Sequence, residues 1–409
     1  MKESAFRAAD ILLPEHIDMT KWSVVACDQY TGQPDYWDAV NALVGDAPST
    51  LRLTLPEIYL EEPDVQARIE RINATMIAYE QANLFRRYPH SFIYTERTLR
   101  DGSVRCGVVG AVDLRQYDFE KGSQSPVRAT EATVAERIPP RVKIREHAAL
   151  ELPHVMLLID DPEKKVIEPL KTAALKKVYD FDLMQNSGHV RGYLVDGEAA
   201  EALQARLDEL SDPARFEKMY GISDRGVLAF AVGDGNHSLA TAKTCDKNHP
   251  TEKSRYALAE VVNLHSDALA FEPIHRVVFD VDAAALLSAL RSELDADERA
   301  DHQSVTVVCG GKEQTLYFHR TTSQLSVGTL QAFLDAWLKA NGGKIDYIHG
   351  DDVVRSLCEK EHTVGFLLGG MKKEELFSTV ILDGALPRKT FSMGHACDKR
   401  FYLEAREIR

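Results

Sequence analysis

The feature that most constrains the fold of this chain is a segment in which a strand, a glycine-lined turn and a helix start follow one another. Residues 226–232 form an almost continuous apolar run, which is typical of a buried strand. Gly233-Asp234-Gly235 comes next, and Asn236-His237-Ser238 then leads into a helix-forming stretch. The N–H groups of such a turn and the positive end of the helix dipole point to one place, so the segment predicts an anion pocket.

The polar side chains of this turn suggest its chemistry. Asp234 is expected where a metal ion or a substrate proton would be handled, and His237 where a phosphate oxygen would be met. The alternative interpretation is an ordinary Asp-Gly turn in which Asn236 or Ser238 caps the helix. The turn lacks the Gly-Lys-Ser/Thr ending of a Walker A loop, and its spacing differs from the GxGxxG of dinucleotide-binding proteins.

The size and composition of the chain are those of a folded protein with more than one domain. Its 409 residues are enough for two or three domains, and 44% of them are hydrophobic and 27% charged. No run approaches the roughly 20 apolar residues that a membrane span needs. Residues 1–7 lack the apolar core of a secretory signal. We therefore expect a cytoplasmic protein with no membrane partner.

Charge and cysteine spacing argue against several classes of protein. A net charge of -14 disfavours a broad nucleic-acid surface, because phosphate contacts need clustered Lys and Arg. The 6 cysteines are scattered with no CxxC pair, which fits reduced thiols better than disulfides or zinc. The sequence has neither an HExxH motif nor a GxSxG elbow, so a zinc hydrolase and a serine hydrolase are not supported.

The order of apolar patterns predicts an α+β fold with mixed sheets. Helices and strands alternate without strict βαβ regularity, and turns at Arg100–Ser103 and Gly310-Gly311 predict hairpins. A soft boundary divides the chain into a region 1–276 and a C-terminal α+β region 277–409. The elements that bear on a site include predicted strands at 22–30, 91–98, 104–114, 153–160 and 400–406, and predicted helices at 63–84 and 198–221.

Two carboxylates outside the turn could take part in its chemistry. Asp28 follows the predicted strand 22–30, and a carboxylate at the C-terminal end of a strand is well placed for chemistry, although an Asx turn explains it equally well. Glu131 follows Arg128 in the polar, loop-like segment 118–152. This loop is either a flap that brings Glu131 over a substrate or a surface helix with salt bridges.

Basic residues outside the turn are candidate phosphate ligands. His275 and Arg276 begin a predicted strand, where they could orient a phosphate or pair with a carboxylate. A structural ion pair at the strand end is the alternative. Lys389 belongs to the basic segment Pro387–Phe391, which is either a phosphate-contacting loop or a solvated one.

These motifs, in this order, resemble a widespread bacterial and archaeal family known as domain of unknown function 1015. The resemblance is carried by residues 232–238, Asn263-Leu264-His265, Glu272–Arg276 and Pro387–Thr390, and it covers nearly the whole chain. Around the turn the family is similar to archaeal free serine kinase, to the nucleotide-binding domain of ParB partition proteins and to sulfiredoxin. The resemblance therefore implies a ParB/sulfiredoxin-like core that handles ATP, ADP or CTP.

Carried over to this sequence, the resemblance implies a role for each residue of the turn. Asp234 matches the aspartate that serine kinase uses near the transferred phosphate, and His237 matches a histidine that contacts the nucleotide. Asn236 replaces the family's usual second histidine, and Ser238 replaces its usual arginine. The missing cation would then come from elsewhere, with three candidates: Arg276, Arg137 and Lys389. The turn contains no cysteine, so sulfinic-acid reduction is not expected.

The leading hypothesis is a nucleotide-dependent phosphotransferase that acts on the hydroxyl of a small metabolite such as free serine. Gly233–Ser238 would hold the phosphates, with Mg²⁺ near Asp234 and with Glu131 or Asp28 accepting the hydroxyl proton. One alternative is a nucleotide-binding switch or scaffold without turnover, and another is a hydrolase of a phosphorylated small molecule. The sequence leaves open whether the chain forms a homodimer.

Overall fold

In the computed structural model, which describes residues 4–131, 133 and 135–409, the chain divides into two compact units. Unit 1 comprises the chain up to Leu269 together with His395–Arg409, and unit 2 is Ala270–Gly394. The sequence-based division differs, since it put the boundary at residue 276 and assigned the last residues to the C-terminal region. These last residues lie in unit 1 because they pair there: β21 (Arg406–Glu407) runs antiparallel to β7 (Leu150–Glu151).

Unit 1 is built on a mixed sheet, in which the described residues form 11 strands. The order is β5-β6-β11-β8-β12-β4-β3-β10-β9, with β1 beside β4 and β2 beside β3. The pairs β5–β6, β6–β11 and β8–β12 are parallel. This mixture confirms the α+β class. The strands are β1 (Phe6–Arg7), β2 (Ala9–Pro14), β3 (Phe85–Thr98), β4 (Val104–Asp113), β5 (Tyr117–Asp118), β6 (Val127–Ala129), β8 (Met156–Ile159), β9 (Lys176–Asp182), β10 (His189–Val195), β11 (Phe230–Asp234) and β12 (Tyr256–Asn263).

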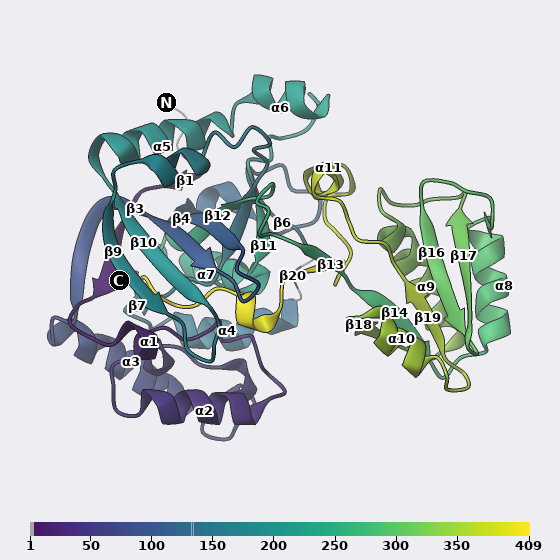
Figure 1. Cartoon of the computed structure of the whole chain (residues 1–409), viewed down its shortest axis with the longest axis horizontal. Helices are drawn as coiled ribbons and strands as arrows, with labels where there is room; N and C mark the ends of the chain where they lie inside the picture. Colours follow the sequence, from purple (N-terminus) through teal and green to yellow (C-terminus); the bar gives the residue numbers. More distant parts are fainter. Residues whose placement is uncertain (1–3, 132, 134) are drawn as a thin grey trace. The chain divides into compact units, whose positions relative to one another are not determined.

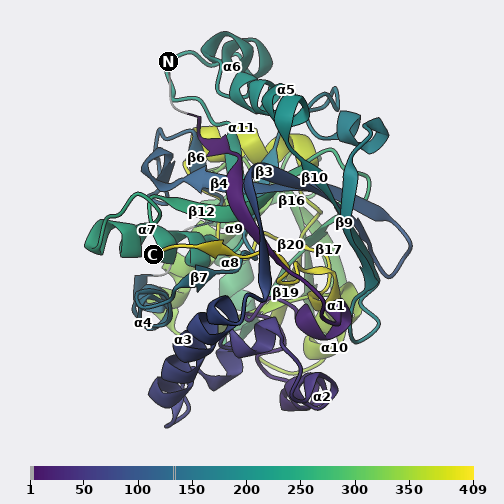
Figure 2. The same ribbon diagram turned by 90° about the vertical axis from the view of Figure 1, so that its left-hand side faces the viewer.

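The sheet of unit 1 buries apolar side chains on both faces, and Figures 1 and 2 show its strands and the helices of this unit. Adjacent residues of a strand point to opposite faces, so Phe92 packs in one buried cluster with Leu203 of α5, and Ile93 packs in another with Trp37 of α2 and Phe401. The helices of this unit are α1 (Met19–Trp22), α2 (Pro34–Val44), α3 (Val65–Gln81), α4 (Ile138–Arg145), α5 (Gly197–Glu209), α6 (Pro213–Tyr220) and α7 (Asn236–Asn248).

Two segments that the sequence predicts as strands are buried but form almost no sheet. Trp22 ends α1, and the rest of 22–30 contributes a single bridge between Val25 and Phe401. Around this bridge Ala26 N–H donates to the carbonyl of Arg400, and Tyr402 N–H donates to that of Val24. The predicted strands 22–30 and 400–406 therefore meet each other over a few residues, which is too short a contact for a ladder.

The helix predicted over 198–221 is interrupted. A new helix begins at Pro213 because the Asp212 carboxylate accepts a hydrogen bond of 2.7 Å from Arg215 N–H, and it ends before Gly221, which is left-handed at a φ of 68°. The two resulting helices are α5 and α6. Among the described residues, no helix combines the length and the apolar character that crossing a bilayer would require.

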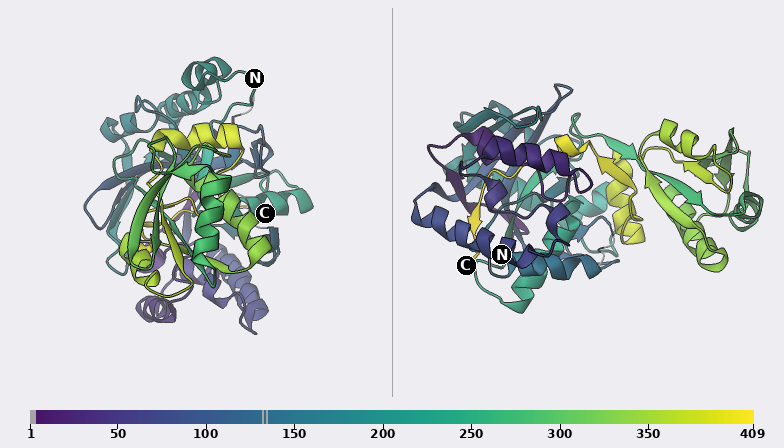
Figure 3. Two further views of the ribbon diagram at one scale, coloured as in Figure 1. Left: turned by 90° about the vertical axis from the view of Figure 1, so that its right-hand side faces the viewer. Right: turned by 90° about the horizontal axis from the view of Figure 1, so that it is seen from below.

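Unit 2 has its own antiparallel sheet with helices around it (Figure 3). The order is β15-β17-β16-β19-β14-β18, and β13 pairs with β20 beside it. α8 contacts α9, and α10 contacts β14 and β19. The elements are β13 (Phe271–Pro273), β14 (His275–Phe279), α8 (Ala283–Glu293), β15 (Ala296–Asp297), β16 (Ser304–Cys309), β17 (Lys312–Phe318), α9 (Ser326–Asn341), β18 (Lys344–Ile348), α10 (Asp351–Leu357), β19 (Val364–Leu367), α11 (Lys373–Asp383) and β20 (Phe391–Met393).

Candidate functional site

The strand, turn and helix that the sequence predicts are present as β11, the single residue Gly235 and α7. The strand lies later in the chain than the predicted run 226–232, because β11 continues to Asp234, which pairs with Met156. Gly235 is the N-cap of α7 and has a left-handed φ of 79°. A Cβ built there would lie 3.0 Å from Val155 Cα, so both the backbone conformation and the space favour glycine. The alternative interpretation, in which Asn236 or Ser238 caps the helix, is wrong because the cap falls on Gly235.

The N-terminus of α7 keeps the features of an anion site. A glycine cap has no side chain with which to accept hydrogen bonds from the first turn. The Gly235 N–H donates to Asp234 Oδ1 at 3.0 Å, and the Leu239 N–H is bonded to the carbonyl of Gly235. Asn236 Oδ1 is buried and has no hydrogen-bond partner among the described residues. An ordered water at this turn would donate a hydrogen bond to that acceptor.

The cation beside this turn is Lys399, which the sequence reasoning missed. Its Nζ lies 3.1 Å from Asp234 Oδ2, and 13% of the lysine side chain is exposed against 23% of the aspartate. The only sequence signal was the charged triplet Asp398-Lys399-Arg400 before an apolar stretch. Such a triplet is common on surfaces, so nothing local could have linked it to the turn.

Asp28 lies within the electrostatic reach of the same lysine. Burial alone would raise the pKa of Asp28, but interaction with His154, a 2.9 Å hydrogen bond from the Gln29 amide and the charge of Lys399 outweigh it and lower the pKa. Lys399 is therefore ion-paired with Asp234 and also acts electrostatically on Asp28, although the three residues are far apart in the sequence.

Glu131 lies near the same edge of the sheet. β6 and β11 run parallel with Ala129 opposite Val232, and the Thr130 hydroxyl donates to the carbonyl of Val232 at 2.6 Å. Continuing this register by two residues takes Glu131 to the level of Asp234. The sequence predictions for Asp28, Glu131 and Asp234 thus fall in one region of unit 1, while their catalytic roles remain predictions.

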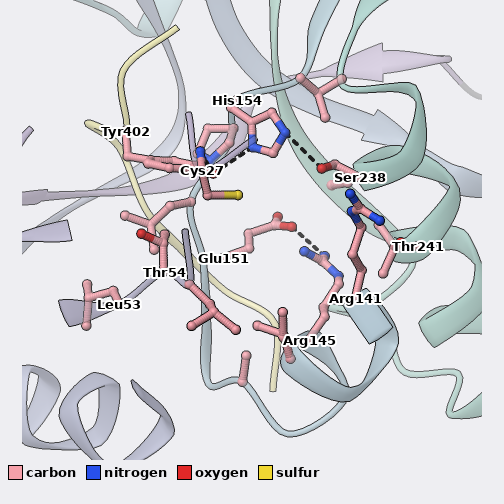
Figure 4. Close-up of a pocket in the computed structure, with 18 of the residues that line it drawn as sticks. Cys27, Leu53, Thr54, Arg141, Arg145, Glu151, His154, Ser238, Thr241 and Tyr402 are labelled. Carbon is pink, nitrogen blue, oxygen red and sulfur yellow. Dashed lines mark hydrogen bonds and ion pairs between the residues drawn. The ribbon is translucent and has the colours of Figure 1, made fainter. Parts of the chain in front are cut away.

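A hydrogen-bonded chain connects α7 to the segment before β8. The Ser238 hydroxyl lies 2.8 Å from His154 Nε2, and the Tyr402 hydroxyl lies 2.8 Å from His154 Nδ1 (Figure 4). The Tyr402 oxygen also accepts a hydrogen bond of 3.2 Å from Cys27 N–H. Ser238 is therefore engaged with His154, and its hydroxyl helps to fix the first turn of α7 against the rest of unit 1.

A buried charge network fixes the C-terminal segment that carries Lys399. Arg400 Nε lies 2.8 Å from Glu260 Oε2, and Arg400 Nη2 lies 2.7 Å from Glu404 Oε2. The Thr95 hydroxyl donates to Glu260 Oε1 at 2.9 Å. Burial alone would raise the pKa of Glu260, but the charges of Arg400 and Arg105 outweigh it, so the pKa is lowered.

The residues predicted to orient phosphate from outside the turn lie in unit 2. The buried Arg276 guanidinium donates to the carbonyls of Arg388 at 2.9 Å and Lys389 at 2.8 Å, and to Gln331 Oε1 at 3.0 Å. His275 Nδ1 accepts from Leu368 N–H at 3.1 Å. Arg276 and His275 thus have structural contacts inside unit 2, and their predicted role toward a phosphate stays a prediction, as does that of Lys389.

The donor set near Asp234 bears on the predicted Mg²⁺. Among the described residues, no group of three or more His, Cys, Asp or Glu side chains is arranged to hold a metal ion. Mg²⁺ is commonly held by one or two carboxylates together with phosphate oxygens and water. The predicted Mg²⁺ would therefore need phosphate oxygens and water beside Asp234 or Asp28, and it stays a prediction.

A comparison with protein families finds a match over most of the chain. A family model described as protein of unknown function (DUF1015) matches residues 6–337. No curated protein matches the sequence.

Several solved structures resemble the chain at low identity. A conserved hypothetical protein from Pyrococcus furiosus shares 10% identity, with a TM-score of 0.37 over 73% of this chain and 94% of that protein. A free serine kinase in complex with AMP shares 11% identity, with a TM-score of 0.39 over 72% of this chain and 90% of the kinase. A variant of a free serine kinase in complex with ADP shares 11% identity, with a TM-score of 0.40 over 74% of this chain and 92% of the kinase.

Proposed function

Starting from the fact that the chain belongs to the DUF1015 family of proteins of unknown function, we propose that it is a cytoplasmic, nucleotide-dependent phosphotransferase acting on the hydroxyl of a small metabolite. The observation that supports this most is the glycine-capped N-terminus of α7, with the Lys399–Asp234 ion pair beside it. Amide donors, a helix dipole and a lysine gathered at one turn suit the charge of a phosphate group.

The residues of the turn would bind and orient the nucleotide phosphates. The first amides of α7 would donate to phosphate oxygens, and Lys399 would neutralise charge there in place of the arginine that Ser238 replaces. Two contacts hold the turn in place: Gly235 packs against Val155, and the Ser238 hydroxyl is hydrogen-bonded to His154. Phosphoryl transfer depends mainly on such positioning and charge neutralisation.

The transfer itself needs a group that accepts the hydroxyl proton. The acceptor oxygen would bond to the terminal phosphorus while the bond from that phosphorus to its bridging oxygen breaks, and the bonding pair would leave with the shortened nucleotide. The proton would pass to Asp28 or Glu131. The lowered pKa of Asp28 means that this carboxylate is ionised at neutral pH and able to accept it. A bound Mg²⁺ would supply further neutralisation of phosphate charge.

The nucleotide and the acceptor define the first assay. ATP, ADP and CTP are the nucleotides to compare, and free serine is the first acceptor because the motif is similar to that of free serine kinase. Purified full-length protein with Mg²⁺ should form phosphorylated product with one of these nucleotides. The Asp234→Asn variant should lose turnover by about 10²-fold or more and keep its fold, because a charge at the reacting phosphate is removed.

Asp64→Asn is the matched control, because Asp64 forms an ion pair with Arg68 at 2.8 Å on a helix surface of the same unit. This variant should retain wild-type turnover. Equal phosphorylation by Asp234→Asn and wild type would remove Asp234 from the mechanism, and a wild type that binds no nucleotide would remove the proposal.

The second candidate is a nucleotide-binding switch or scaffold without turnover. It is favoured by Ser238, whose hydroxyl is bonded to His154 and which gives the turn no cation of its own. Calorimetric titration with the three nucleotides, followed by mass spectrometry of mixtures with hydroxy amino acids, separates the candidates. Saturable binding without any phosphorylated product or released phosphate would favour the switch.

A further inference from the structure

A cavity of about 150 Å³ lies against the first turns of α7 in unit 1. Most of its wall is apolar and comes from the segment 148–155, the chain before α3, α4 and α7, with Leu53, Leu152, Ile144 and Leu239 among the lining residues. Ligand sites for small organic groups have this character, in which an apolar wall carries a few polar groups that fix orientation.

The size of the cavity selects a class of ligand. A closed apolar cavity of roughly 150 Å³ accommodates a benzene molecule, and this cavity is open on one side, so a planar base larger than benzene can enter it with one edge outside. This volume is too small for a whole nucleotide, and it suits a planar ring whose attached groups extend outward. The ligand part that fits is therefore an aromatic ring system.

The charged groups on the cavity wall are already paired with one another. Arg145 bonds to Glu151 (Figure 4), and Arg141 bonds to Glu57. Burial raises the pKa of the Cys27 thiol to about 12, so it lines the cavity as a neutral group. A zwitterion such as a free amino acid would have to break these pairs or bury its own charges at a large cost. The wall thus favours a neutral ring over the charged acceptor.

The cavity and the phosphate turn share a wall. Ser238 lies in the first turn of α7 and also lines the cavity, as does His154, to which it is bonded. Cys27 lines the cavity, and the next residue, Asp28, is influenced by Lys399. A molecule with its phosphates at the α7 N-terminus would therefore have an apolar chamber directly beside them.

We propose that this cavity binds the planar base of the nucleotide whose phosphates bind at the turn between β11 and α7. The inference rests on the proposed function, because it takes the phosphate site as given. It adds a second recognition element, in which apolar contact with the base supplies affinity that phosphate contacts alone would not.

The test introduces a larger side chain at a residue that lines the cavity. Ala242 is buried on α7 and lines the cavity, so Ala242→Leu would occupy space that the base needs. Three probes are titrated calorimetrically into the full-length protein: ATP, inorganic tripolyphosphate and adenosine. Ala242→Leu should weaken ATP binding by about tenfold or more, because the apolar contact of one ring is lost, and should leave tripolyphosphate binding unchanged.

Two controls keep the test interpretable. Ala200→Leu makes the same change on α5, where the side chain is also buried but does not line the cavity. It should leave the affinities for ATP and for tripolyphosphate unchanged. If Ala242→Leu fails to fold, Leu60→Phe enters the cavity from a half-buried position, with Leu43→Phe on an exposed site as its control.

The outcomes separate this inference from the function on which it rests. Unchanged ATP affinity in folded Ala242→Leu overturns the base assignment. A wild type that binds adenosine but not tripolyphosphate, with adenosine lost in Ala242→Leu, overturns the phosphotransferase and supports the cavity as a ring site. A wild type that binds none of the probes overturns both.

Discussion

Lys399 and Asp234 form an ion pair with a distance of 3.1 Å between Nζ and Oδ2, although the whole of unit 2 lies between them in the sequence. The next residue, Arg400, is held by two buried carboxylates, so the lysine is carried on a fixed piece of backbone. The positive charge at the turn therefore depends on the end of the chain rather than on the motif itself.

The first prediction concerns this lysine. Lys399→Met keeps most of the side-chain length but removes the charge, and it leaves Asp234 without its cation. Nucleotide affinity should fall by about 10–10²-fold, because a charge-assisted contact to phosphate is worth roughly 1.5–3 kcal/mol. Calorimetric titration with ATP and ADP measures the change.

Lys165→Met is the control for Lys399→Met, since Lys165 forms an exposed ion pair with Glu163 on the same unit. Its affinity for nucleotides should equal that of wild type. An Lys399→Met protein with wild-type affinity would mean that the ammonium group serves only to hold Asp234.

The second prediction concerns the glycine at the cap of α7. Gly235 and Gly122 have almost the same left-handed φ, 79° and 81°, but only Gly235 has atoms within 4 Å of a built Cβ. Gly122→Ala should therefore lower the unfolding free energy by about 1 kcal/mol, the cost of the conformation alone. Gly235→Ala should cost more, because the new methyl group presses on Val155, and it should also weaken nucleotide binding. Urea denaturation and titration of both variants test this; equal stability losses would show that the Val155 contact yields without strain.

Local patterns in the sequence were enough to identify the turn. Glycine on both sides of Asp234, after an apolar run and before a helix-forming stretch, restricts the backbone to a strand, a turn and a helix start, and the structure has β11 and α7 there. The hairpin between β3 and β4 follows in the same way from the Gly102 turn. Both depend on interactions within a few residues.

Features that depend on tertiary contacts could not be predicted. Lys399 reaches Asp234 because its segment is held by the ion pairs of Arg400 and by the chain around Val25, where the two predicted strands share one bridge and form no ladder. Arg276 had the residue type of a phosphate ligand, yet its guanidinium is bonded to backbone carbonyls of its own unit. Residue type and spacing do not reveal which partner a long side chain selects.

The third prediction contrasts two buried arginines. Arg400 is bonded to Glu260 and Glu404, so Arg400→Met leaves two buried carboxylates without their cation and should lower the unfolding free energy by about 3–5 kcal/mol. Arg97 lies opposite Arg105 across β3 and β4, and its Nε and Nη1 have no hydrogen-bond partner in the described part of the chain.

Arg97→Met should therefore change the unfolding free energy by less than about 1 kcal/mol, since it relieves repulsion from Arg105 while losing one bond to the Cys397 carbonyl and the contact with the Phe401 ring. Urea denaturation of both variants makes the comparison. Equal losses would show that position in the network does not decide the cost of removing a buried arginine.

The fourth prediction is the loss of stability in acid. Glu260 ordinarily has a pKa of 4.5, and in the folded protein the neighbouring arginines hold it lower despite burial. Just below pH 4.5 the unfolded chain binds a proton at this carboxylate while the native protein does not, so protonation favours unfolding. The contribution is complete above this pH and is lost as the pH falls through the native pKa.

Glu260→Gln isolates this contribution, because a glutamine does not titrate. Urea denaturation across the acid range at high salt, which screens the exposed ion pairs but not this buried one, should give a smaller pH slope for Glu260→Gln than for wild type. Glu163→Gln, which removes an exposed carboxylate, should retain the wild-type slope. A Glu260→Gln profile parallel to that of wild type would mean that Glu260 takes up its proton at the same pH in the folded and unfolded chains, and that the arginines around it hold the C-terminal segment without keeping this carboxylate ionised.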